Sequence, residues 1–160
     1  MNTRIIFLFF FLNATFLLFS QEDLLNHARQ QEYLHPETAL LLVASRAGTF
    51  TVLELPANPS EKLEEIGIIV PAQIRWQLNE SPTSEQWTSA GAFSFLVTQL
   101  YDIPGGMFYS LMPGAHYASR ELQYLNLLPS DMHPGEPISG TMATSILDRV
   151  DLMLENGDIR

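Results

Sequence analysis

The chain has 160 residues, of which 46% are hydrophobic and 16% are charged. This balance indicates one folded domain with its own core rather than a disordered chain. The formal net charge of -10 makes nucleic acids and anionic membrane surfaces unfavourable partners, because their phosphates repel an acidic protein. The sequence contains no cysteine, which excludes disulfides, thiol chemistry, cysteine metal sites and lipid attachment through cysteine.

The segment 1–20 is typical of a secretory signal. A basic Arg4 precedes a long apolar run, and Ser20 ends the segment. The run is short for a membrane span, which needs ~20 apolar residues. The sequence therefore predicts export to the periplasm or the cell surface, with cleavage after Ser20. A retained membrane anchor is the alternative, because Leu18 is larger than the small residue usual at that position before a cleavage site.

Residues 21–57 are expected to form an N-terminal helical region. Apolar residues at helical spacing predict a helix over 21–34, which ends before the proline-containing pair that follows. A second helix is predicted over 37–47, with Gly48 as its end. Residues 49–55 are rich in branched and aromatic types, so they form either a short strand or an extended connection.

Proline and glycine mark the next helix and the loop after it. Asn58 is a suitable N-cap, Pro59 suits the first helical position, and Gly67 ends the helix. Residues 71–86 contain two prolines. We therefore predict that they form a loop, which carries Trp76.

A long helix is predicted from Thr88, whose hydroxyl can cap the first turn, to about Leu100. Trp87 precedes the cap, where its ring can pack against the helix as a hydrophobic staple. The run 102–106 contains a proline and two glycines, and it therefore ends the helix.

Two more helices are predicted in the C-terminal part of the chain. Residues 116–128 form the first, after a connection at 108–114, and Pro129 ends it. Ser139 caps the last helix, which continues to Gly157. The fold class expected from these elements is all-α.

These elements form an internal repeat of helix, loop and helix. The two units span about 58–104 and 115–157, and their cap residues Thr88 and Ser139 stand 51 positions apart. A pair of helices cannot bury its apolar face alone, so the two units are expected to pack on each other. Residues 21–57 are either a third, degenerate unit or a separate arm.

The repeat resembles the S-layer homology family, in which a short helix and a loop lead to a longer helix. That helix opens with a hydrophobic residue followed by Thr-Arg-Ala-Glu. The segment 87–91, Trp-Thr-Ser-Ala-Gly, matches the threonine and the alanine, with Ser89 in place of the arginine and Gly91 in place of the glutamate. In the second unit, residues 138–142 fit only at the hydrophobic and hydroxyl positions. The resemblance covers about residues 58–154.

The resemblance implies a noncatalytic cell-envelope module that binds wall glycan, such as peptidoglycan, or an envelope protein. We expect no cofactor and no metal. Family members use the motif arginine to contact an anionic polymer, and both motif arginines are missing here. An acidic domain without them would hold an anionic glycan poorly. The alternative is therefore a protein–protein interaction subunit of an envelope complex that binds no glycan.

Six residues are the candidate ligand contacts. They comprise the openers of the two motif helices, one replacement cation with its neighbour, and two aromatic rings in predicted loops that can stack on sugars: Thr88, Ser139, Arg120, Glu121, Trp76 and Tyr109. The structural alternative for Arg120 is an ion pair with Glu121 or another acid.

The four histidines include no pair at metal-ligand spacing. A metal site from His116, Glu121, Asp131 and His133 would need the fold to bring these residues together, and we expect surface or core positions instead. A histidine-centred enzyme is the third function considered. It requires at least two histidines and an acid in one cavity. The sequence contains no Gly-x-Ser-x-Gly motif.

Overall fold

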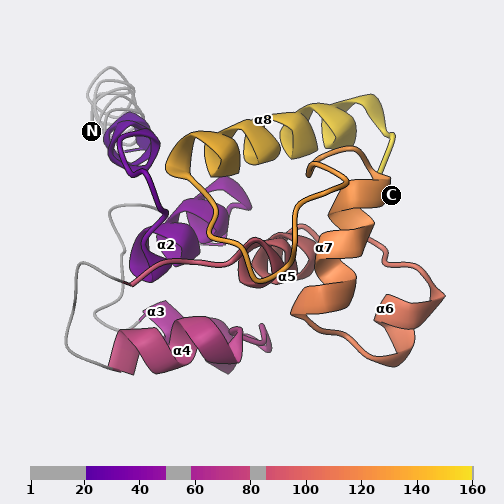
Figure 1. Ribbon diagram of the computed structural model, residues 1–160, viewed down its shortest axis with the longest axis horizontal. Coiled ribbons are helices and arrows are strands. Elements are labelled where there is room, and N and C mark those ends of the chain that lie inside the picture. Colours follow the sequence, from indigo (N-terminus) through magenta and orange to yellow (C-terminus); the bar gives the residue numbers. More distant parts are fainter. Residues whose placement is uncertain (1–20, 50–58, 80–85, 160) are drawn as a thin grey trace, which may run out of the picture.

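The computed structural model describes residues 21–49, 59–79 and 86–159, apart from the side chains of residues 79 and 108 (Figure 1). This part of the chain is built from helices and their connections, which confirms the all-α fold class. Its only strand-like contact is an isolated bridge between Ser89 and Pro137. The predicted signal segment and most of the predicted strand at 49–55 lie outside the described residues. No helix in the described ranges is long and apolar enough to cross a membrane.

The region before residue 50 contains a helix at residues 21–29 and α2 (Pro36–Arg46). The first helix ends earlier than predicted because the segment after it bonds to distant parts of the chain. The carbonyl of Gln31 accepts from the amide of Gly140 at 3.0 Å, for example. Proline at the first position of α2 costs no hydrogen bond, because that amide has no partner within a helix. Gly48 follows α2 with a left-handed φ of 73°, as its predicted role as a helix end requires.

Two shorter helices follow, α3 (Pro59–Glu65) and α4 (Ala72–Asn79). The α3 helix was predicted, and Gly67 turns the chain after it with φ 86°. The α4 helix falls where a loop was predicted, and that prediction was wrong. Pro71 initiates this helix rather than breaking it: its carbonyl accepts from the amide of Arg75 at 3.0 Å. Ile74 is fully buried and attaches α4 to the core.

The middle of the chain forms α5 (Ala90–Leu100), α6 (Met107–Leu111) and α7 (Ala115–Tyr124). Every residue of α5 from 90 to 98 is buried, so this helix is the centre of the molecule. The five-residue α6 falls, apart from Met107, in the segment 108–114 that was predicted as a connection. The α7 helix ends before the predicted position 128 because Asn126 adopts a left-handed φ of 58°.

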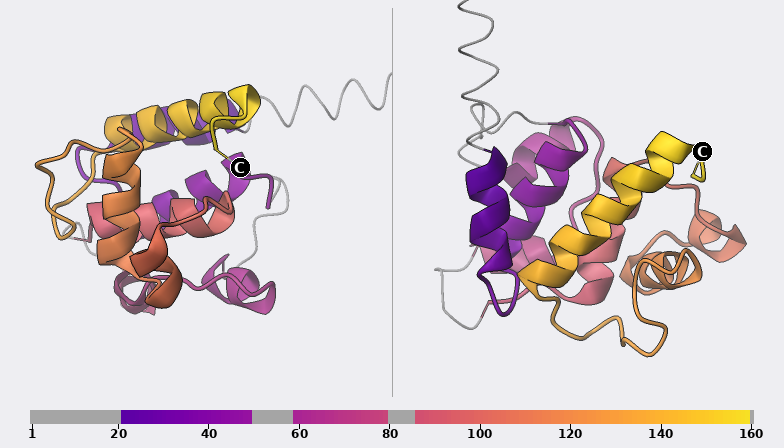
Figure 2. Two further views of the ribbon diagram at one scale, coloured as in Figure 1. Left: turned by 90° about the vertical axis from the view of Figure 1, so that its right-hand side faces the viewer. Right: turned by 90° about the horizontal axis from the view of Figure 1, so that it is seen from above.

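The last helix, α8 (Gly140–Asn156), has the predicted boundaries. Ser139 caps it by accepting from the amide of Met142 at 3.2 Å, and Gly157 ends it with φ 74°. Figure 2 shows α8 on one side of the molecule and α3 and α4 on the opposite side, with α5 between them. The core fills this space, and Phe93 of α5 is its largest fully buried side chain.

Three extended residues from distant parts of the chain form a closed ring of backbone hydrogen bonds. The amide of Leu34 donates to Ile138 at 2.7 Å, the amide of Ile138 donates to Thr88 at 3.0 Å, and the amide of Thr88 donates to Leu34 at 2.8 Å. All three residues are fully buried. Each one directly precedes the N-cap residue of a helix, so α2, α5 and α8 all begin at this backbone ring: His35, Ser89 and Ser139.

A group of charges connects α2 to α8 farther along both helices. Arg46, whose side chain is 16% exposed, donates from Nη2 to Asp148 at 2.8 Å and from Nε to Asp151 at 3.0 Å. Burial alone would lower the pKa of Arg46, but the bonds and charges of these two carboxylates raise it. Beside them, burial and then the Asp151 charge raise the pKa of Tyr101, the C-cap residue of α5. This Arg46 cluster therefore holds α2 and α8 together at a second point.

Candidate functional site

The two predicted cap residues of the motif helices have structural roles. Ser139 caps α8, as predicted, and its hydroxyl is occupied there. The prediction for Thr88 was wrong, because Ser89 caps α5 by accepting from the amide of Ala92 at 3.2 Å. The backbone ring engages the amide and the carbonyl of Thr88, and the helix starts one residue later than predicted. The buried hydroxyl of Thr88 has no hydrogen-bond partner among the described residues, and it is closed off from the surface.

The two aromatic candidates lie in different environments. Trp76 is 61% exposed on α4. Tyr109 of α6 faces inward: its hydroxyl lies 2.9 Å from Oγ1 of Thr98, and its ring meets Phe95 edge-on at a centroid distance of 6.3 Å. Tyr109 thus anchors α6 to α5, whereas Trp76 is free of such a role.

The remaining pair lies on α7. Arg120 is exposed and forms no ion pair with a described carboxylate, so the structural alternative, an ion pair with Glu121 or another acid, is not found among the described residues. Glu121 lines a small cavity of about 330 Å³ beside Gly105, Gly106 and Tyr124. The six predicted contacts are therefore spread over α4, the backbone ring, α6, α7 and the start of α8, and they do not form one site.

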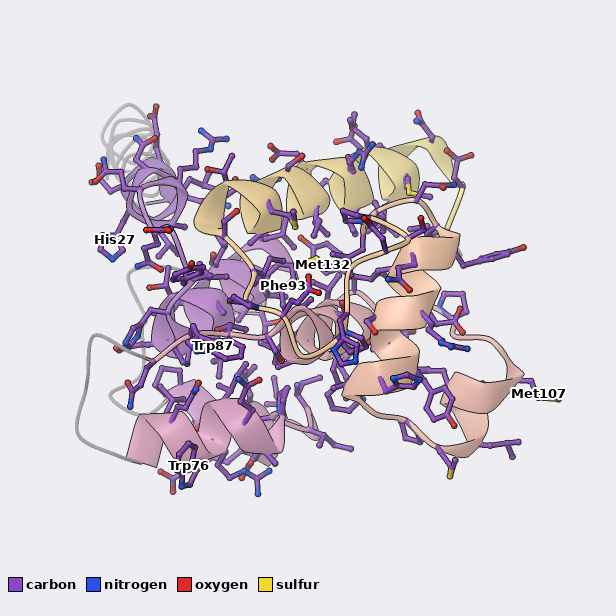
Figure 3. The ribbon with its side chains drawn as sticks, viewed as in Figure 1. His27, Trp76, Trp87, Phe93, Met107 and Met132 are labelled. Carbon is purple, nitrogen blue, oxygen red and sulfur yellow. The ribbon has the colours of Figure 1, made fainter. Side chains whose placement is uncertain are left out.

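A groove of about 780 Å³ lies where the helix at 21–29 and the turn after it meet the start of α2 and residues 86–87. Its lining combines aromatic rings, imidazoles, amides, one hydroxyl and two carboxylates: Tyr33, Trp87, His27, His35, Gln31, Gln86, Thr38, Glu32 and Glu37. In Figure 3, the labelled His27 and Trp87 both lie on the left side of the molecule. We call this the His27–Trp87 groove, and its size is typical of small-ligand pockets.

Gln31 organises the polar side chains of the His27–Trp87 groove. Its Nε2 lies 3.0 Å from Nε2 of His27 and donates to Oγ1 of Thr38 at 3.0 Å. Its Oε1 accepts from the backbone amide of His35 at 2.8 Å. One side chain therefore connects the helix at 21–29 to the first turn of α2, which positions the polar groups before any ligand arrives.

His35 occupies an N-cap position that holds a capping serine in the other two segments joined by the backbone ring. Ser89 and Ser139 occupy the N-cap positions of α5 and α8, and each serine hydroxyl accepts a helix amide. His35 is the N-cap residue of α2 and makes no side-chain capping bond. Histidine is a poor N-cap residue, and departures from local preference are expected mainly at functional sites. The His35 imidazole instead lines the groove.

The other histidines do not form a site. His116 packs edge-on against Tyr117 at a centroid distance of 5.4 Å, and Nδ1 of His133 accepts from the amide of Gly135 at 3.0 Å. Within the described residues, no group of three histidines or acids has a geometry that could hold a metal ion.

Compared with protein families, curated proteins and solved structures, the chain matches none.

The sequence predictions missed most of the groove. Trp87 was interpreted as a packing residue, and the pair at 35–36 only as a helix boundary. The available signal was the density of aromatic and imidazole side chains between residues 27 and 38. That signal had no partner in the sequence, because the pairing of Leu34 with Thr88 is visible only in the fold.

Proposed function

We propose that the protein is a noncatalytic module of the cell envelope that binds wall glycan in the His27–Trp87 groove. The observation that carries this proposal is the groove itself, in which two aromatic rings stand among imidazoles, amides, a hydroxyl and two carboxylates. The backbone ring supports the related proposal of S-layer-homology-like units, because it gives equivalent places to the starts of α2, α5 and α8. On this view, residues 21–49 belong to a third unit rather than to a separate arm.

Retention on purified peptidoglycan tests the glycan proposal. The protein is expected to sediment with the polymer, and Trp87→Ala is expected to abolish this retention. Trp76→Ala is the matched control, because Trp76 is exposed on α4 outside the groove. Retention no greater than that of an acidic control protein rejects the proposal.

Export belongs to the same proposal, and cleavage after Ser20 would make Gln21 the first residue of the mature protein. The mass of the protein after export from an expressing cell is the test. Recovery of the protein with Met1 to Ser20 still attached would support the membrane-anchored alternative.

Binding to an envelope protein is the second candidate, and the surface of α6 favours it. Three apolar side chains on α6 and directly after it project outward: Met107, Leu111 and Met112 are 70%, 72% and 59% exposed. In Figure 3, Met107 lies at the opposite end of the molecule from His27. Methionine adapts well to protein surfaces. Loss of a copurified envelope protein in Leu111→Ser, with Trp87→Ala unaffected, would favour this candidate over glycan binding.

The enzyme candidate gains one observation, because His27 and His35 share the groove with Glu32 and Glu37. However, neither imidazole bonds to a carboxylate among the described residues, and the nearby Thr38 hydroxyl accepts from Gln31. No activated nucleophile is therefore formed. Appearance of new reducing ends in peptidoglycan, and their loss in His35→Ala, would replace the binding proposal with a hydrolase.

A further inference from the structure

We propose that the His27–Trp87 groove binds an uncharged sugar chain and discriminates against anionic polymers. This assignment rests on the proposed glycan-binding function, and it names the ligand class and the contacts of that same site.

The two aromatic residues of the groove are held by the backbone ring. Tyr33 directly precedes Leu34, and Trp87 directly precedes Thr88, so each aromatic residue is the chain neighbour of a residue that the backbone ring fixes. The carbonyl of Trp87 also accepts from Nε2 of Gln73 at 3.3 Å. Tyr33 is 53% exposed and Trp87 is half-buried. Aromatic side chains on an anchored backbone can stack on the apolar faces of sugar rings with little loss of backbone freedom on binding.

The polar groups of the groove suit hydroxyl and amide groups of a ligand. Imidazoles both donate and accept hydrogen bonds, as sugar hydroxyls do. His35 makes no side-chain capping bond to the first turn of α2, and its only hydrogen bond to a side chain within the described residues uses its backbone amide. Its imidazole is therefore available to a ligand. Gln31 is already satisfied by three protein partners and serves to position the site rather than to bind.

Charge separates this ligand class from the anionic polymers that the sequence resemblance implied. The described residues that line the groove include no lysine and no arginine, and they include the two carboxylates of Glu32 and Glu37. The whole chain carries a net charge of -10. An anionic ligand would meet repulsion without any compensating cation, so complementarity favours an uncharged ligand.

Tryptophan fluorescence gives a direct test, because the chain has two tryptophans and Trp76→Phe leaves Trp87 as the only reporter. The purified Trp76→Phe protein is titrated with a hexamer of N-acetylglucosamine and with the same hexamer carrying carboxymethyl groups. We expect saturable binding of the neutral hexamer with little dependence on salt, and binding at least tenfold weaker for the carboxymethylated hexamer. Equal or tighter binding of the charged hexamer overturns the inference.

Tyr33→Ser and His35→Ala test the contacts, and thermal denaturation confirms that each variant is folded. Both are expected to weaken binding of the neutral hexamer at least tenfold. Unchanged affinity in Tyr33→Ser overturns the assignment, because this exposed side chain has no other described role. If the protein is retained on peptidoglycan but the neutral hexamer does not bind, the ligand assignment fails alone. If neither is bound, the proposed function fails as well.

Discussion

Replacing Gly140 with alanine is expected to destabilise the protein, although helix preference alone predicts the opposite. Gly140 is the first residue of α8, where the end of the helix at 21–29 approaches it. A Cβ atom on Gly140 would stand 1.6 Å from the carbonyl oxygen of Ala28, less than half the 3.4 Å of ordinary contact. The obstacle is backbone, so α8 and the helix at 21–29 must separate.

The size of the effect follows from the hydrogen bonds that cross this contact. The amide of Gly140 donates to Gln31 at 3.0 Å, the hydroxyl of Thr141 donates to Arg29 at 3.3 Å, and the amide of Leu34 donates to Ile138 at 2.7 Å. Each such bond contributes about 1 kcal/mol, so their disruption lowers the free energy of unfolding by about 3 kcal/mol. Alanine in a helix would by itself raise it by roughly 0.5–1 kcal/mol. The sign of the change therefore decides between the two effects.

Urea unfolding followed by circular dichroism measures this difference, and thermal melting should show a drop of roughly 10 °C. Gly114→Ala is the matched control, because no atom lies within 4 Å of its Cβ position and its φ of -176° suits any residue. We expect the control to change stability by less than about 1 kcal/mol. A Gly140→Ala protein as stable as the wild type would refute the close approach of the two helices.

Three further predictions concern residues of the fold. Ser89→Ala should lower the free energy of unfolding, measured by urea denaturation, by about 1 kcal/mol, because it removes the cap of α5. Thr88→Val should be neutral or stabilising, because the buried hydroxyl of Thr88 has no described partner. A larger loss of stability in Thr88→Val than in Ser89→Ala would show that Thr88 is the cap after all. Arg46→Met should lower the free energy of unfolding by about 2 kcal/mol, because it leaves the carboxylate of Asp151 without its cation. Adding Asp151→Leu should recover most of this loss, and simple additivity of the two changes would contradict this account. The raised pKa of Tyr101 contributes stability that is complete below the ordinary value of 10.0 and is lost above it, by about 1.4 kcal/mol per pH unit. The free energy of unfolding of Tyr101→Phe should therefore fall less steeply with pH above this value than that of the wild type. Equal slopes for the two proteins would refute the assignment.

Helices whose signals are local were predicted well, and those that depend on distant contacts were not. The boundaries of α8 were predicted because Ser139 and Gly157 act through their own backbone neighbours. In contrast, α4 was missed because proline can begin a helix as well as end one, and only the burial of Ile74 in the core decides between these outcomes. The cap of α5 was displaced by one residue for the same reason. Thr88 and Ser89 are both good caps, and the distant Leu34 and Ile138 determine which one is used.

The candidate site shows this dependence on long-range structure most clearly. Trp87 and the residues around His35 are far apart in sequence, and they share a groove only because Thr88 bonds to Leu34. No periodicity or motif in the sequence reports that contact. The individual side chains were visible in the sequence, but their meeting point was not.

The backbone ring also constrains how the chain can be made. The ring closes only when all three residues are present. The amide of Leu34 and the carbonyl of Thr88 therefore lack their partners until Ile138 has left the ribosome, when most of the chain has already been synthesised. A chain that stops before Ile138 exposes one free amide and one free carbonyl that fit the missing segment. An intact molecule carries that segment, and shortened chains are therefore expected to bind the Ile138 segment and α8 of intact neighbours.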